Sequence, residues 1–228
     1  MKVSLRDDRL LPALALVDPT LTLSLSPRLT AETGLDAITQ LIELYLSPFS
    51  TPITDAFCRE GIPNALHALP RAIARPSDLA ARSDMALASL LGGLALANAK
   101  LGAVHGLAGV IGGRTGGAHG AICGRLLPHV LMLNVRALRD RDPANPARRR
   151  LDEVAGWIAD AHDSTLDEAF EFLESRVDLL GVARLGAIGL KWGAFRDVAG
   201  KSTRASSMRG NPIELTEDEL VQVLTYAH

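Results

Sequence analysis

The sequence predicts a mainly helical protein, a helical bundle with a short strand or hairpin at its N-terminal edge. Beyond Ser47-Pro48, apolar residues recur almost throughout the chain with helical spacing. Residue types that cap helices stand before several of these apolar segments. Residues 13–17, ALALV, form the one segment typical of a buried strand, because this short apolar run is bounded by Pro12 and by Asp18-Pro19.

The composition excludes several classes of function. The 228 residues are 47% hydrophobic and 22% charged, with a net charge of −2, as in ordinary soluble globular proteins. The scattered arginines form no basic stripe, which argues against a nucleic-acid partner, and the basic run 148–150 is interpreted as solvated surface. The chain lacks a signal-peptide pattern and its apolar runs stop short of a membrane span, so we expect a cytoplasmic protein without a membrane partner.

The predicted strand at 13–17 needs a partner, because a lone strand leaves its backbone N–H and C=O groups unpaired. Two alternatives are open at this point. Residues 2–5 could form a hairpin with it, or its partners could lie on another polypeptide segment that this chain does not include.

The first helices are expected between caps and prolines. One helix begins at Pro27 behind the capping residue Ser26, and Thr33-Gly34 is expected to interrupt it. A second helix begins near Thr51 and is expected to end at Pro70, because proline cannot donate the helical hydrogen bond.

A third helix is predicted over residues 79–98. Because this segment is apolar on most faces, we place it in the centre of the bundle, with Gly92-Gly93 at a close helix contact. A glycine-rich break over 112–117 follows. Another apolar helix is then predicted over 119–138, with a kink at Pro128.

The C-terminal third alternates exposed loops and amphipathic helices. We expect a loop over 140–146, helices over 150–161 and 165–180, a turn-rich loop over 206–212 and a last helix over 217–226. Ser164 would open the helix over 165–180, and Thr216 would cap the last one.

Three of the six histidines lie around the glycine-rich break: His105, His119 and His129. The imidazoles of His105 and His119, set on either side of the break, could be aimed into one cleft, as a metal or a substrate oxyanion would require. The alternative is that glycine allows close helix packing and that the histidines are ordinary partly buried residues. Cys58 and Cys123 match no metal or redox spacing, and we interpret both as reduced packing residues.

A second polar group lies on the helix that follows Gly34. Asp36 and Gln40 are four residues apart and share one face, and Glu43 lies three residues beyond Gln40 on nearly the same face. A carboxylate with an amide neighbour can be a pair of ligands. The alternative is a helix-start aspartate near its cap.

Four segments carry a resemblance to a known family: GLDAITQLIELYLS, ANAKLGAVHGLAGVIGG, AHGAICGRLLPHVLMLN and SSMRGNPIELT. In order and spacing they closely resemble the C-terminal half of iron-containing (group III) alcohol dehydrogenases, which have the dehydroquinate synthase-like fold. The resemblance covers essentially the whole chain. It implies a helical domain that binds a divalent metal, usually iron or zinc, beside an N-terminal α/β domain that binds NAD(P), with hydride transfer in the cleft between them.

The resemblance also implies metal ligands, which in the family are one aspartate and three histidines. The matching positions here are Asp36, Gln40, His105 and His119. Gln40 weakens the predicted site, because a neutral amide oxygen binds iron or zinc less well than an imidazole nitrogen. A further family histidine, placed near the nicotinamide and the substrate, falls at Gly109, so that catalytic side chain is absent.

Most cofactor contacts of the family have no counterpart here. Lys2 resembles a family lysine that contacts the cofactor, but no glycine-rich G-G-G-S type turn for the pyrophosphate is present. By this resemblance, residues 1–24 correspond to an edge of the nucleotide-binding domain and residues 25–228 to the helical metal and substrate domain. We expect a truncated or split family member that depends on a nucleotide-binding partner chain.

Two functions of different classes follow. The first is NAD(P)-dependent interconversion of a small alcohol and an aldehyde, by this chain joined to its partner. The second is a non-catalytic helical remnant that acts as an interaction or oligomerisation module. A domain without its partner should expose apolar surface, so we expect self-association into a homo-oligomer.

Overall fold

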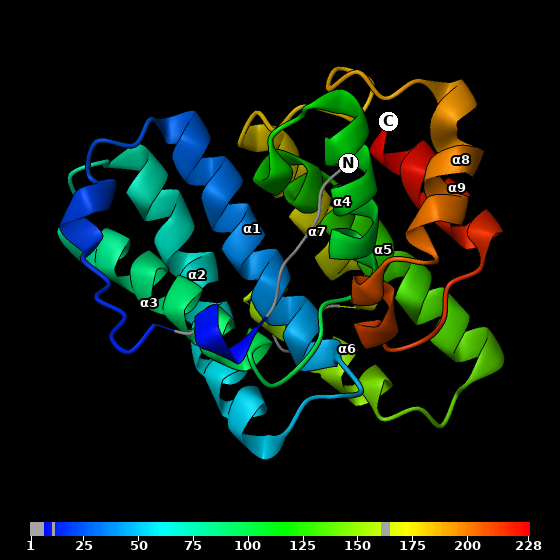
Figure 1. The fold of residues 1–228 in the computed structure, drawn as a ribbon, viewed down its shortest axis with the longest axis horizontal. Coiled ribbons are helices and arrows are strands. Elements are labelled where there is room, and N and C mark those ends of the chain that lie inside the picture. Colours follow the sequence, from blue (N-terminus) through cyan, green and yellow to red (C-terminus); the bar gives the residue numbers. More distant parts are fainter. Residues whose placement is uncertain (1–6, 11, 161–164) are drawn as a thin grey trace.

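The computed structural model describes residues 7–10, 12–160 and 165–228, and within these residues it contains nine α-helices and no strand (Figure 1). The prediction of a mainly helical bundle is confirmed. The helices are α1 (Pro27–Leu46), α2 (Pro52–Ala74), α3 (Leu79–Leu96), α4 (Ala103–Thr115), α5 (His119–Arg141), α6 (Ala147–Ala159), α7 (Leu166–Leu179), α8 (Phe195–Ser202) and α9 (Glu217–Ala227). Short 3₁₀ turns are η1 (Asp8–Leu10), η2 (Pro19–Thr22), η3 (Trp192–Ala194) and η4 (Ser206–Gly210).

Helices α1 and α5 form the centre of the bundle. α1 packs against α2, α3 and α5, while α5 also contacts α4, α7 and α9. Every residue of α5 from Ala121 to Leu131 is buried, so this part of the helix is surrounded by the rest of the bundle. Within the described residues, α3 and α5 are long and apolar enough to cross a membrane, but this is weak support for a span because buried core helices have the same length and composition.

The prediction that the third helix lies in the centre is wrong. α3 lies at the edge of the bundle and packs on α2 and α1 through small residues such as Ala88 and Gly92 (Figure 1). The close helix contact predicted at Gly92 is therefore present. Leu79, Leu87 and Leu94 are 45%, 42% and 44% exposed, so α3 turns apolar side chains outward.

The predicted strand at 13–17 is also wrong. These residues have no strand pairing in the described part of the chain, and the side chains of Leu14 and Leu16 are 82% and 86% exposed. A segment cannot form a ladder of hydrogen bonds without a second strand beside it. The hairpin partner considered above, residues 2–5, lies outside the described residues.

The interruption predicted at Thr33-Gly34 and the helix end predicted at Pro70 both lie inside continuous helices. α1 continues through Thr33-Gly34, and the missing side chain of Gly34 makes room for Leu69, whose Cδ1 would lie 2.3 Å from a Cβ on that glycine. α2 continues through Pro63 and Pro70 to its end. A proline inside a helix costs roughly 3 kcal/mol, and the packing of α2 against both α1 and α3 offsets that cost.

Local capping signals agree better with the structure. Ser26 and Thr216 each accept a backbone N–H at the start of a helix, as predicted, and Thr51 and Asp78 cap α2 and α3 in the same way. α7 is capped by Thr165, and Ser164 lies outside the described residues. The sequence pattern missed α8, which is only eight residues long.

Arg150 corrects the prediction that the run 148–150 is only solvated surface. Its guanidinium donates two hydrogen bonds of 2.7 Å to the carboxylate of Asp55 and one of 2.6 Å to the carbonyl oxygen of Tyr45. The side chain is 22% exposed. This bidentate pair ties α6 to α2 and to the end of α1.

His129 is a core residue on α5. It is 1% exposed, its Nε2 lies 3.7 Å from Oε1 of Glu174, and within the described residues neither ring nitrogen makes a hydrogen bond. Burial, assisted by the charges of Arg125 and Arg184, lowers the pKa of His129 from 6.5 to about 4. The imidazole is therefore neutral at pH 7.

Acid should destabilise the fold partly through His129. Its pKa is lower in the folded chain than in the unfolded one, so the unfolded state binds the proton first and the free energy of unfolding falls as the pH drops from 6.5 to about 4. The full shift corresponds to roughly 3 kcal/mol. Urea unfolding in the presence of EDTA should show that His129→Met loses this part of the pH dependence.

His67 on α2 provides a comparison at an exposed position, because its side chain is 62% exposed. The pH dependence of His67→Gln, measured alongside, separates the effect of burial from the loss of an imidazole as such. Equal pH dependence in wild type and His129→Met would contradict this role of the buried imidazole.

Candidate metal centre

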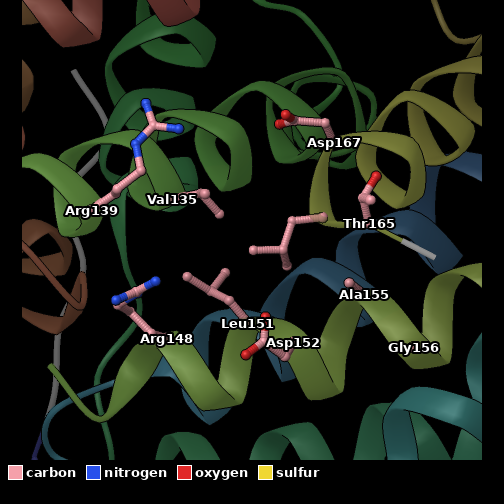
Figure 2. A pocket seen from close by; sticks show the side chains of 10 residues that line it. Val135, Arg139, Arg148, Leu151, Asp152, Ala155, Gly156, Thr165 and Asp167 are labelled. Atoms are coloured by element: carbon pink, nitrogen blue, oxygen red, sulfur yellow. The ribbon is translucent and has the colours of Figure 1, made fainter. Parts of the chain in front are cut away.

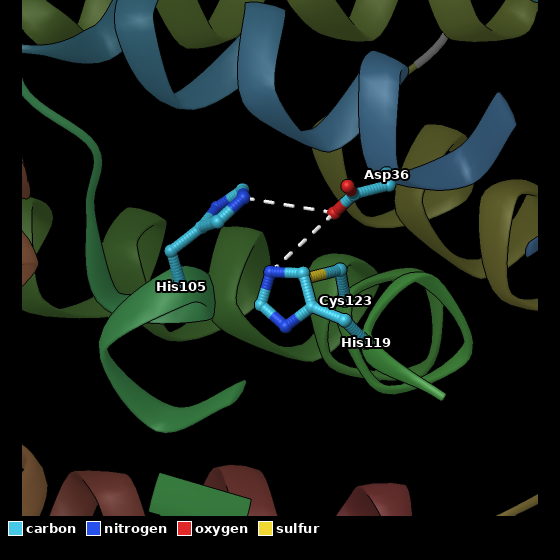
Figure 3. Close-up of side chains that lie close together, drawn as sticks. All are labelled: Asp36, His105, His119 and Cys123. Carbon is cyan, nitrogen blue, oxygen red and sulfur yellow. Dashed lines mark hydrogen bonds and ion pairs between the residues drawn. The ribbon is translucent and has the colours of Figure 1, made fainter. Parts of the chain in front are cut away.

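Asp36, His105, His119 and Cys123 come together where α1, α4 and α5 meet (Figure 3). One donor atom from each lies within 4.8 Å of the others. Asp36 Oδ1 is 3.6 Å from Nε2 of His105 and 3.8 Å from Nε2 of His119, and the Sγ of Cys123 is 3.7 Å from the same nitrogen of His119. Three of the four predicted ligand positions thus converge, together with a thiol that the sequence reasoning assigned to packing.

The chain reversal between α4 and α5 sets the position of His119. α4 runs to Thr115 and ends at Gly116, whose φ of 71° lies in the left-handed region that favours glycine. α5 then begins at His119 itself, so the break is shorter than predicted. Because His119 and Cys123 are one helical turn apart, both side chains point from the start of α5 toward Asp36 (Figure 3).

The backbones of α1 and α5 approach each other closely beside this cluster. A Cβ on Gly120 would lie 2.0 Å from the carbonyl oxygen of Glu32. Only glycine fits there, because a carbonyl group within a helix cannot move aside without breaking the helix. Asp36 follows Glu32 by one turn on α1, so this approach sets the first turn of α5 against the Asp36 carboxylate.

Glu43 orients His105. Its Oε2 lies 2.6 Å from Nδ1 of His105, and its Oε1 accepts the backbone N–H of Val104 at 2.6 Å. The side chains of Glu43 and His105 are 5% and 8% exposed. An ionised carboxylate only accepts hydrogen bonds, so we assign the His105 proton to Nδ1, which leaves the lone pair of Nε2 facing Asp36.

Gln40, the remaining predicted ligand position, packs toward α3. It lies one turn after Asp36 on α1, and its amide nitrogen would lie 2.9 Å from a Cβ added at Gly92. The structure thus places the amide at the contact between α1 and α3. The role of Gln40 as a ligand stays a prediction.

A cleft of about 770 Å³ opens beside the two histidines. His105 and His119 line it together with Gly109 of α4 and Lys201 of α8. Apart from its chain neighbours and the nearby backbone of α4, no described residue lies within 4 Å of the place where a side chain on Gly109 would begin, so the cleft has room where the family carries a further histidine. Lys2, the predicted cofactor contact, lies outside the described residues.

A second pocket, of about 540 Å³, lies between α5, α6 and α7 and shares no residue with the metal cluster (Figure 2). Arg139 and Arg148 contribute positive charge to its wall, and Asp152 and Asp167 contribute negative charge. The formal charges of these four side chains sum to zero, so the pocket carries no net charge of one sign.

The donor atoms of the cluster fit a divalent metal. Around a tetrahedral ion with bonds of about 2.0–2.3 Å, neighbouring donors lie about 3.3–3.7 Å apart. The three separations above, from 3.6 to 3.8 Å, are close to this range, and all four donor atoms lie within 4.8 Å of one another. Asp36 Oδ1 is buried and, within the described residues, receives no hydrogen bond, so its lone pairs are available to a cation.

The helical part of the chain matches a known family. Residues 30–228 match the family model described as "Fe-containing alcohol dehydrogenase family, C-terminal". The chain belongs to the iron-containing alcohol dehydrogenase family. It is 34% identical to alcohol dehydrogenase 4 of Saccharomyces cerevisiae over 100% of this chain and 58% of that protein. It is 33% identical to 1,3-propanediol dehydrogenase of Citrobacter freundii over 96% of this chain and 56% of that protein.

Solved structures of this family share the fold. Alcohol dehydrogenase from Oenococcus oeni superposes with a TM-score of 0.83 at 31% identity, over 92% of this chain and 54% of that one. Sulfoacetaldehyde reductase from Bifidobacterium kashiwanohense, solved in complex with NAD+, has a TM-score of 0.81 at 28% identity, over 96% of this chain and 55% of that one. This iron-containing alcohol dehydrogenase family member therefore spans little more than half the length of these relatives.

The place of Cys123 in the cluster and the contact between Glu43 and His105 were not predicted from the sequence. Cys123 follows His119 by four residues on a predicted helix, and that spacing could have indicated a shared face. Glu43 was placed near the face of Asp36, but nothing local indicated that it would meet His105. That contact joins residues far apart in the sequence, so only the packing of α1 against α4 reveals it.

Glu43→Gln should weaken metal binding without removing a ligand. An amide can donate as well as accept, so it no longer holds His105 in one tautomer, and loss of such a partner typically lowers metal affinity about 10–100-fold. Competition with a zinc chelator measures the affinity. Glu60→Gln, at an exposed position of α2, is the matched control and should bind zinc like the wild type. Unchanged affinity in Glu43→Gln would rule out this orienting role.

Proposed function

We propose that this chain is the metal- and substrate-binding part of an NAD(P)-dependent oxidoreductase that interconverts a small alcohol and its aldehyde. The observation that carries the proposal is the convergence of Asp36 Oδ1 with Nε2 of His105 and of His119 at the wall of a cleft. Membership of the family supports the reaction class. The name of one relative, 1,3-propanediol dehydrogenase, supports an alcohol as substrate.

The side chains of this site have different roles in binding the metal, orienting its ligands and moving protons. Asp36, His105 and His119 would hold the divalent metal, iron or zinc, with Gln40 as a weak further donor. The bound metal supplies a Lewis acid that polarises the alcohol or aldehyde oxygen. Glu43 keeps Nε2 of His105 aimed at the site. Gly109 offers no acid or base, so a proton would pass through water or a group of the substrate itself.

Hydride transfer would require a nucleotide-binding unit beside this domain. We assign residues 1–24 to an edge of a nucleotide-binding unit, in which Lys2 would contact NAD(P), and residues 25–228 to the metal and substrate domain. The exposed side chains of Leu14 and Leu16 support this assignment, because a partner would cover such apolar groups. The chain spans 58% of the length of its Saccharomyces cerevisiae relative. We also propose that the protein is cytoplasmic.

The second candidate is a non-catalytic interaction or oligomerisation module. The outward leucines of α3, at positions 79, 87 and 94, favour it, because such an apolar face promotes association into a homo-oligomer. Metal binding separates the two candidates, since an interaction module has no use for a metal at this cluster.

The purified chain should bind about one Fe²⁺ or Zn²⁺ per molecule. His105→Ala and His119→Ala should each lose this metal, because each removes an imidazole donor. His67→Ala, which removes an exposed histidine outside the cluster, should retain it. Elemental analysis after gel filtration measures the metal content. A wild type that stays metal-free after incubation with excess metal would contradict the first candidate and favour the second.

A further inference from the structure

We propose that Cys123 is a metal ligand of this site and that its thiolate makes the site prefer zinc to iron. The inference rests on the metal centre of the proposed function and goes beyond it, because it concerns the identity of a donor and of the metal and does not depend on turnover. The ligand set implied by the family contains an aspartate and histidines but no cysteine.

The position of the sulfur supports this role. Sγ of Cys123 lies 3.7 Å from Nε2 of His119 and within 4.8 Å of the donor atoms of Asp36 and His105. A tetrahedral zinc ion needs nitrogen and sulfur donors about 3.6 Å apart. Cys123 is fully buried in the second turn of α5, so the helix holds its sulfur in this place.

At Gln40, this chain lacks a histidine that the family uses as a metal ligand. The neutral amide of Gln40 is a poor ligand for iron or zinc, and the amide nitrogen packs against Gly92 of α3. Asp36, His105 and His119 therefore supply three strong donors. Cys123 can supply a fourth donor, from α5.

A thiolate changes the metal preference of the site. Sulfur is a soft ligand that favours zinc, whereas imidazole suits both iron and zinc and carboxylate suits harder metal ions. When the metal binds, the S–H bond breaks, the sulfur electron pair forms the bond to the metal, and the proton is released to water. No oxidation or reduction takes place in this step.

The alternative is that Cys123 only shares a hydrogen bond with His119, since a sulfur–nitrogen distance of 3.7 Å also suits that contact. In that case the sulfur lies outside the coordination shell. Removal of the thiol would then leave the spectrum of a bound metal unchanged.

A cobalt titration followed by absorption distinguishes these cases, because Co²⁺ occupies tetrahedral zinc sites and a thiolate ligand gives an intense sulfur-to-cobalt charge-transfer band. The wild type should show this band. Cys123→Ser should bind Co²⁺ without the band, and its preference for Zn²⁺ over Fe²⁺ should fall. Cys58→Ser is the matched control: Cys58 is also fully buried but lies outside the metal cluster, so the band should persist.

X-ray absorption at the zinc edge gives a second readout that needs no variant. Zinc-loaded wild type should show one sulfur about 2.3 Å from the metal. A wild type that binds metal through His105 and His119 but shows neither the band nor a sulfur neighbour overturns the inference and leaves the proposed function intact. A band that survives in Cys123→Ser also overturns it. A wild type that binds no metal overturns both proposals.

Discussion

The close approach of α1 and α5 at Gly120 is the constraint on which the candidate site depends. Any side chain at this position would overlap the carbonyl oxygen of Glu32, so the two central helices can lie this close only with glycine there. The approach brings the start of α5 against Asp36. With a wider helix separation, the carboxylate and the α5 donors would be too far apart to share one ion.

Helix α1 organises the site from the other side as well. Asp36 and Glu43 lie two turns apart on nearly one face, and the two carboxylates contact opposite nitrogens of the same His105 ring. Glu43 also accepts a backbone N–H in the first turn of α4, a group that the helix itself leaves unpaired. The orientation of the imidazole, the start of α4 and the charge beside the cluster are therefore coupled through one buried carboxylate.

Local chemistry made part of this structure predictable. Caps such as Ser26 and Thr216 bond to backbone only a few residues away, and the histidines at 105 and 119 flank a glycine break that is visible in the sequence. Long-range packing decided the rest. α2 passes through Pro70 because α1 and α3 support it, and α3 is peripheral because its small residues pack inward and its leucines face outward. Cys123 belongs to no sequence motif of metal-binding cysteines, because an aspartate and a histidine of its cluster lie on other helices, far away in the sequence.

Anomalous X-ray diffraction at the zinc edge, from crystals of the zinc-loaded chain, would locate the metal itself. We expect a peak between Asp36 Oδ1 and Nε2 of His105 and of His119, with Glu43 still bonded to Nδ1 of His105. Zinc held only by other residues, or no peak at this position in crystals saturated with zinc, would contradict the claim that α1, α4 and α5 build a metal centre.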